Sequence, residues 1–362
     1  MPVYRVVDNH IVSQAEYRAR SPDLAKFLSA RAIGNATSSF ALSGGRTLDV
    51  VAPPPALFTA AIPPIGMGLP LTILIRDVYT GNNPDNTFLF GDGADVALVS
   101  GVKNYDVFNA STRALNFLVQ RQLPHSHMRR PAAFTDGTAV VAYSPAILTD
   151  ALTVSIELAV ATFPQDFVNS LSTAFNTLAG IPLLLPYSGY LLGAGQLFKL
   201  AGNVGHALFD GIKFSITDSI DFDISGVAPT PAGFRILSTF DATQYQYKDG
   251  QGLLDASGNP YAGDDPYVVI LLDGQKRDNL KNFAPTVASS AILQRFFQIQ
   301  DGAQAAVDAI VQGLQLVSDL KYRDQATSLK AQIAAAPPAD QPALQKQLDA
   351  VLKNISTPAL KP

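Results

Sequence analysis

An alternating stretch, LTVSIELAV at residues 152–160, decides the fold class of this chain. Every second residue is a large aliphatic one, and the residues between them are Thr153, Ser155, Glu157 and Ala159. Successive side chains of a β-strand point to opposite faces of a sheet, so this alternation predicts a half-buried strand. A strand of this kind indicates an antiparallel sheet or a sandwich.

Strand-like sequence continues on both sides of this stretch. Runs of Val, Ile and Leu dominate residues 47–160, where turn-forming clusters such as GNNPD at 81–85 and GDG at 91–93 separate them. Alternation resumes further on, at residues 212–216, 220–224, 234–240 and 267–272. We therefore expect a mainly β chain with some α structure, built from two β-sandwich-like units at residues 36–163 and 211–300.

Three segments have helical signals instead. Residues 1–35 predict a helical lead-in, because Ser21-Pro22-Asp23 supplies an N-cap, a proline in the first turn and an acidic residue behind it. Residues 164–210 place Phe and Leu at helical spacing and predict an apolar helical hairpin inserted between the two β units. A C-terminal helical hairpin is expected over residues 301–362, on the apolar stripe Val307, Ile310, Leu314, Val317 and Leu320.

Composition excludes several classes of protein. Hydrophobic residues make up 47% of the 362 residues and charged residues 15%, which is too apolar for a disordered chain. The net charge of −4 offers no broad positive field, so nucleic acid is not an expected partner. The chain has no Cys, which excludes disulfides, thiolate nucleophiles and Cys-ligated metals. Charges near the N-terminus interrupt any signal-peptide core and favour a cytoplasmic location, with peripheral attachment to a membrane left open.

An acidic loop and the strand after it form the most specific local string. The residues are GDDPYVVILLDG at 263–274, preceded by DASG at 255–258. This string resembles the loop-and-strand signature of C2 domains, in which an Asp-Pro-Tyr-Val sequence leads from a calcium-binding loop into a sandwich strand. The resemblance implies Ca²⁺ as a cofactor, with Asp255 and Asp265 as its ligands.

Other readings of the acidic residues stay open. The spacing from Asp255 to Asp265 is longer than in C2 domains, and Ca²⁺ needs six to eight oxygens. Further ligands would have to come from Asp218, Asp221 and Asp223. An acidic loop of the first unit would use Asp85, Asp92 and Asp95. Asp-rich turns that serve only the backbone explain the same residues, since turns select Asp and Gly.

Two histidines are the candidates for catalysis. His125 and His127 lie two residues apart, which on a strand places both rings on one face, where zinc would need a third ligand. A surface loop is the simpler interpretation of this Pro-flanked segment. Neither a Gly-x-Ser-x-Gly elbow nor a phosphate-binding glycine loop is present, so a hydrolase would have to use His125 or His127 with a distant carboxylate.

Residues 167–198 contain no Asp, Glu, Lys, Arg or His. Pro182 and Pro186 interrupt the run, which disfavours a membrane-spanning helix. The segment either packs on the sheet or leaves it to meet a bilayer or a protein partner, and Leu192 and Phe198 are then the expected contact residues.

These features together favour a non-enzymatic binding or effector module, at a membrane surface or within a protein assembly, with possible assistance from calcium. The C-terminal hairpin is the expected site of a protein partner or of self-association. Two other classes remain: a hydrolase with dispersed catalytic residues, and a structural subunit of a shell or tail.

Overall fold

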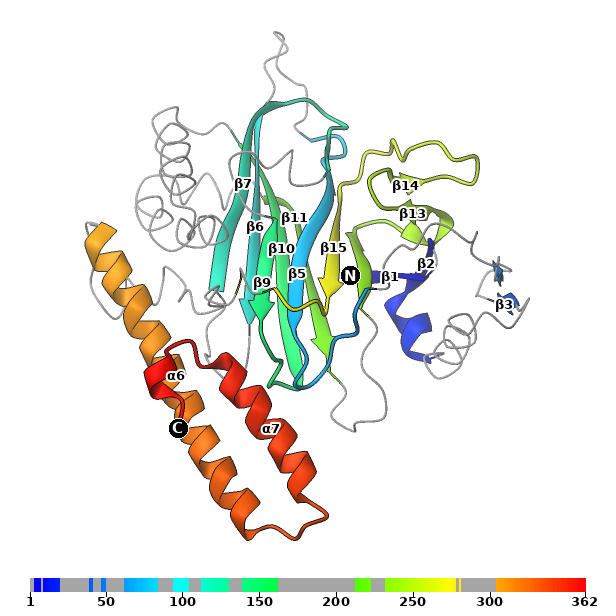
Figure 1. Ribbon diagram of the computed structural model, residues 1–362. Coiled ribbons are helices and arrows are strands. Elements are labelled where there is room, and N and C mark those ends of the chain that lie inside the picture. The colour runs from blue at the N-terminus through cyan, green and yellow to red at the C-terminus, as the bar shows by residue number, and fades with distance from the viewer. Residues whose placement is uncertain are drawn as a thin grey trace.

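The computed structural model describes residues 3–7, 9–19, 39–41, 47–49, 62–83, 94–103, 112–129, 139–161, 212–222, 232–277, 280 and 304–362. These residues form mostly strands, and two helices follow at the C-terminal end (Figure 1). The expected class, mainly β with α structure, is confirmed.

The larger of the two main sheets contains nine strands from the described part of the chain. Its order is β14-β13-β2-β1-β12-β15-β5-β8, and β9 also pairs with β5. All of these pairs are antiparallel. The strands are β1 (Val3–Val7), β2 (His10–Ser13), β5 (Leu71–Tyr79), β8 (His127–Arg129), β9 (Val140–Ser144), β12 (Gly233–Ser238), β13 (Gln246–Lys248), β14 (Gly252–Leu254) and β15 (Tyr267–Asp273).

A second sheet packs against one face of the first. It has the order β11-β10-β6-β7, with β6 at Ala94–Lys103, β7 at Thr112–Gln122, β10 at Ala151–Ala161 and β11 at Ile212–Asp221. The short strands β3 (Ser39–Ala41) and β4 (Thr47–Asp49) pair only with each other among the described strands.

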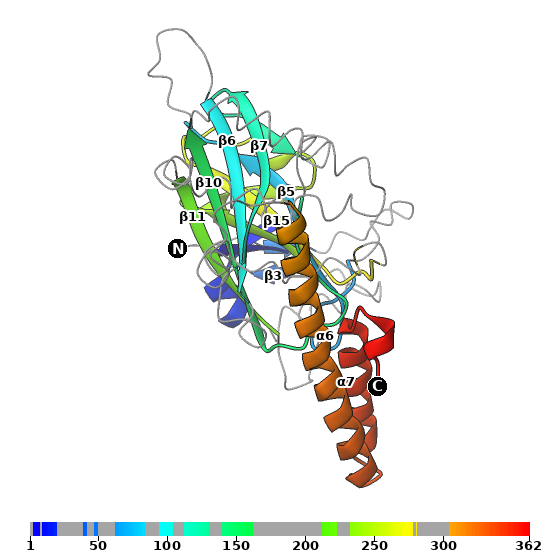
Figure 2. The ribbon, with the colours of Figure 1, turned by 90° about the vertical axis from the view of Figure 1, so that its left-hand side faces the viewer.

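Alternate residues of both sheets fill one hydrophobic core between them. In β10 the inward residues are Val154, Ile156 and Leu158, as the alternation in the sequence predicts. Ile73 and Ile75 of β5 enter the same core from the opposite sheet. Full burial of such a side chain stabilises the fold by about 1.5–3 kcal/mol, so this row holds the two sheets together. Figure 2 looks onto the four-stranded sheet, and β5 and β15 of the larger sheet lie behind it.

The two β units expected at residues 36–163 and 211–300 are not separate. β5 of the first pairs with β15 of the second, and β10 of the first pairs with β11 of the second. Alternation identifies a strand, but its hydrogen-bond partner depends on long-range packing that the local pattern does not contain. The expected apolar hairpin at 164–210, with Leu192 and Phe198, lies outside the described residues.

The helical lead-in expected at residues 1–35 is wrong for its first part. β1 and β2 form a hairpin there, with Asn9 at a φ of 69° in the turn. Val and Ile at alternate positions suit a sheet, and β1 gains β12 as a partner on its other side. A short helix then covers residues 14–19, and Ser13 accepts a hydrogen bond from the Glu16 amide at its start. The helix expected from Ser21 lies outside the described part of the chain.

A second apolar cluster lies on the outer face of the larger sheet. Tyr4, Ile236, Tyr267 and Val269 point to this face, because they alternate with residues that enter the main core. The segment after β12, which contains the short helix η3 (Ala242–Gln244), β13 and β14, covers them. This covering segment brings loops over the β5–β15 pair.

The expected C-terminal hairpin is confirmed. It consists of α6 (Gln304–Ala335) and α7 (Gln341–Asn354), followed by the short helix η5 (Pro358–Leu360). Ala326, Leu348 and Val351 are buried between the two helices. The hairpin extends away from one end of the sheets in both views (Figures 1 and 2). None of the described helices has the length and apolar character that a membrane crossing requires.

Candidate functional site

A β-bulge in β5 directs Asp77 away from the main core. Leu71, Ile73 and Ile75 enter that core, but the next residue to do so is Val78. The register with β15 shifts at this point, because Ile75 pairs with Ile270 while Asp77 pairs with Val269. Arg76 is therefore the extra residue of the bulge, and Asp77 turns to the outer face, as bulges near functional sites commonly do.

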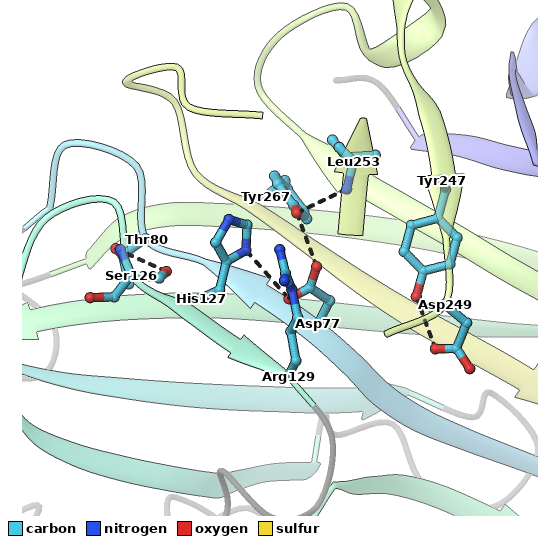
Figure 3. Close-up of polar contacts among 9 residues, drawn as sticks. All are labelled: Asp77, Thr80, Ser126, His127, Arg129, Tyr247, Asp249, Leu253 and Tyr267. Atoms are coloured by element: carbon cyan, nitrogen blue, oxygen red, sulfur yellow. Dashed lines mark hydrogen bonds and ion pairs between the residues drawn. The ribbon is translucent and has the colours of Figure 1, made fainter. Parts of the chain in front are cut away.

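Asp77 lies at the centre of a polar cluster that we call the Asp77 cluster: Asp77, His127, Arg129 and Tyr267. Tyr267 donates a hydrogen bond of 2.9 Å to Asp77 Oδ2. On the other side, Arg129 Nε lies 3.6 Å and His127 Nδ1 lies 3.8 Å from Asp77 Oδ1. Figure 3 shows these side chains converging from β5, β8 and β15. The strand register brings Arg129 next to Asp77, because the two residues are cross-strand partners in the β5–β8 pair.

Several buried polar atoms meet at this point. Asp77 Oδ1, His127 Nδ1 and both Nε and Nη2 of Arg129 are buried and have no hydrogen-bond partner within the described part of the chain. Their separations of 3.6–3.8 Å are electrostatic contacts rather than hydrogen bonds. A shift of a few tenths of an ångström would close either contact, so the carboxylate is shared between an imidazole and a guanidinium.

Gly252 provides the space in which the cluster fits. A Cβ atom on this residue would lie 2.7 Å from Asp77 Oδ2, 2.8 Å from the Tyr267 hydroxyl and 3.0 Å from Arg129 Nη2. The φ of Gly252 is also +86°, a conformation that side chains disfavour. The start of β14 therefore lies directly on the charged groups only because residue 252 has no side chain.

The second histidine contacts a neighbouring tyrosine. The Tyr79 hydroxyl lies 2.8 Å from His125 Nδ1 and donates to the Gly263 carbonyl at 2.9 Å. A phenol has one proton to donate, so we assign the proton of the shared bond to His125 Nδ1. His125 has a φ of 59°, and its backbone amide donates a hydrogen bond of 2.7 Å to the Gly81 carbonyl. Non-glycine residues in this conformation concentrate at functional sites and turns.

Burial raises the pKa of Tyr267, and the charge of Asp77 raises it further. Burial also raises the pKa of Tyr79, with a smaller contribution from Asp264. Both phenols therefore stay protonated at neutral pH and act as donors. His127 Nδ1 faces the carboxylate of Asp77, so the tautomer with its proton on Nδ1 suits this contact and leaves Nε2 as the acceptor nitrogen of the neutral ring. Such a pair can transfer protons, and it can also simply orient the ring.

The predicted calcium ligands have other partners. Asp255 accepts hydrogen bonds from the Ser257 amide, the Asn259 amide and the Asn259 side chain, and these bonds lower its pKa. Asp265 accepts one from Thr239. Among the residues that the structure describes, no group of three or more His, Asp and Glu is placed to hold a metal ion. Calcium binding at this loop stays a prediction.

The remaining predicted acids are dispersed. Asp218 forms an ion pair with Arg235, Asp221 forms one with Arg18, and Asp95 accepts a hydrogen bond from the Arg121 amide. The other candidates lie outside the described ranges: Asp85, Asp92 and Asp223.

The sequence pattern singles out His127 but not its partners Asp77, Arg129 and Tyr267. A signal for Asp77 was present, since the charged pair Arg76-Asp77 interrupts the otherwise apolar run LTILIRDVY of β5. Comparisons with protein-family models, with curated proteins and with solved structures found no match to this chain.

Proposed function

We propose that this chain is a non-enzymatic binding module that works within a protein assembly and docks through its C-terminal hairpin. A separation of charge carries the proposal. Residues 320–362, the part of the hairpin after Asp319 and here called the basic arm, contain six Lys or Arg and three Asp, a formal net charge of +3; with Asp308 and Asp319 of the same helix, residues 304–362 carry +1. The remaining residues 1–319 carry −7. A basic arm on an acidic body is electrostatically suited to bind another acidic surface.

The attachment of the arm supports this role. Asn354 donates a hydrogen bond of 3.0 Å to the Ala146 carbonyl, and Leu148 packs against the hairpin core. These contacts hold the arm near the end of α7, and the helices extend from there away from the sheets (Figure 1). By length α6 reaches about 48 Å and α7 about 21 Å, so the hairpin presents a long surface relative to its attachment.

The partner that suits this arm is a second copy of the same chain, because residues 1–319 carry a net charge of −7, opposite in sign to that of the arm. Contact between the arm of one copy and the body of the next is heterologous. Such contacts close into rings or continue as filaments, depending on the rotation between copies. A subunit of a larger assembly is therefore the role that this charge arrangement favours.

Analytical ultracentrifugation over a range of protein and salt concentrations tests the proposal. We expect assembly at low salt that weakens as salt screens the charges. The exposed residues Lys346 and Lys353 lie on α7, and their joint replacement by Glu should leave a monomer. Lys248→Glu, on the exposed face of β13, is the matched control and should assemble normally.

Two results would overturn this proposal. One is a wild type that stays monomeric at every concentration and salt level. The other is binding of that monomer to vesicles with anionic headgroups but not to itself, which would move the arm's function to a membrane surface.

A second candidate, a hydrolase, is favoured by the contact between His127 and Asp77. A carboxylate that orients a histidine is the arrangement of a general base, and His125 contributes a strained backbone beside it. Ester hydrolysis above the rate of free imidazole would support this candidate, provided that His127→Asn abolishes it and His10→Asn does not. A wild-type rate equal to that of imidazole would remove it.

A further inference from the structure

Three charged residues occupy positions that face the main core. Arg5 lies on the same side of β1 as the buried Val3, and Arg235 on the same side of β12 as Leu237. Across the sandwich, Asp218 follows Phe214 and Ile216 in the inward row of β11. Alternation would place apolar side chains at all three positions, so the charges need an explanation other than core packing.

Arg235 and Asp218 form an ion pair between the two sheets. Arg235 Nη1 donates to Asp218 Oδ2, and each side chain is only 3% exposed. Arg5 is the cross-strand neighbour of Arg235, because the two residues are paired in the β1–β12 ladder. Among the described residues, the Asp218 carboxylate thus acts on both guanidinium groups.

The cluster carries an excess positive charge. Arg5 donates from Nε to Gln14, and its guanidinium lies 4.0 Å from the centre of the Tyr17 ring. These neutral groups do not balance its charge. Burial, followed by repulsion from Arg235, lowers the pKa of Arg5 to about 10. Asp218 acts on both arginines, but one carboxylate offsets one positive charge only.

A donor of Arg235 is also left without an acceptor. Its Nη2 is buried and has no hydrogen-bond partner among the described residues. A guanidinium offers five N–H donors in a fixed plane and prefers an anion as acceptor. One negatively charged acceptor would both balance the excess charge and accept a hydrogen bond from the unused donor.

We propose that a compact monovalent anion, with chloride as its simplest form, binds between Arg5 and Arg235. The anion accepts from Arg235 Nη2 and balances the second guanidinium. The helix at residues 14–19 covers Arg5 through Gln14 and Tyr17, and the contact of Arg18 with Asp221 ties this helix to β11. Anion binding thereby stabilises the junction between the N-terminal hairpin and the second sheet.

Thermal unfolding of the full chain in sodium chloride and in sodium gluconate, at equal ionic strength, tests this site. Gluconate is too bulky for the interior, so chloride should raise the Tm by about 2 °C near saturation. Broadening of the chloride NMR signal by the folded protein is the independent measurement of binding.

Variants locate the effect. Arg5→Met should abolish both the chloride shift and the line broadening, whereas Arg5→Lys keeps the charge and should retain them. Arg323→Met is the control and should retain the chloride shift, because Arg323 pairs with Asp324 on the exposed surface of α6. Equal Tm values for the wild type in the two salts would overturn the proposal, and so would a full chloride shift in Arg5→Met. If Arg5→Met does not fold, the chloride shifts of the wild type and of Arg5→Lys still test whether the anion binds.

Discussion

Tyr267 and Asp77 are 190 residues apart in sequence and share a hydrogen bond of 2.9 Å on the outer face of the larger sheet. The same Tyr267 hydroxyl accepts from the Leu253 amide at 3.2 Å. One phenol thus joins β5, β15 and β14. Because the carboxylate of Asp77 also faces His127 and Arg129, this phenol fixes the position of the whole Asp77 cluster.

Replacement of Tyr267 by Phe should destabilise the fold by about 2 kcal/mol, because it leaves a buried carboxylate oxygen and the Leu253 amide without their partner. Urea unfolding measures this change. Tyr245→Phe is the control, since Tyr245 packs beside Tyr261 on the same face, and it should change stability by less than about 0.5 kcal/mol. Equal effects of the two substitutions would mean that the hydroxyl of Tyr267 contributes only packing.

Stability should fall as pH rises above 10. Burial raises the pKa of Tyr267, Tyr247 and Tyr261 above the value of 10.0 that they have in the unfolded chain. Above that pH the unfolded chain releases protons that the folded chain retains, which favours unfolding. Below pH 10 these groups add no pH dependence. Urea midpoints measured on both sides of pH 10 check the prediction, and Tyr267→Phe should reduce the slope.

Gly252 and Gly258 offer a matched pair, because both have a φ near +85° but only Gly252 touches the Asp77 cluster. A Cβ atom at residue 258 would lie near no other atom within 4 Å, so Gly258→Ala should lower the free energy of unfolding only by the backbone strain, about 1–2 kcal/mol. Gly252→Ala adds a steric clash of Cβ with Asp77, Tyr267 and Arg129, so the total loss of folding stability should exceed about 3 kcal/mol. Similar losses for both variants would show that the cluster moves aside freely.

The sequence predicts some parts of this molecule well and others poorly for one physical reason. The LTVSIELAV stretch of β10 shows its buried face directly, because alternation is a property of neighbouring residues. The Asp77 cluster depends on which strands pair, on their register and on the bulge at Arg76. Those features arise from contacts between segments about 50 and 190 residues apart, and no local pattern contains them. Only the charged pair inside an apolar strand marks the position.

Calcium binding at Asp255 and Asp265 should be weak, with a Kd in the millimolar range, because two carboxylates supply few of the six to eight oxygens that Ca²⁺ requires. The carboxylate of Asp255 also accepts three hydrogen bonds from its own turn. Calorimetry of the wild type and of Asp265→Asn measures the effect. Heat from the wild type that the variant lacks would support the site, and no heat at millimolar calcium contradicts it.

Asp319 holds the end of the chain against α6, and its loss should release the segment after α7. Its two carboxylate oxygens accept from the Ser356 amide at 3.0 Å and the Thr357 amide at 2.8 Å, and the side chain is fully buried. Asp319→Ala leaves both amides without an acceptor and should cost about 3 kcal/mol, since each bond involves a charged group. The exposed Asp349 of α7 is the control, and Asp349→Ala should cost less than about 0.5 kcal/mol.

Hydrogen exchange gives the sharper measurement, because faster exchange at Ser356 and Thr357 with unchanged protection in β10 would show a local opening of the hairpin. If exchange at these amides were the same in both variants, Asp319 would not be the contact that fastens this end of the hairpin.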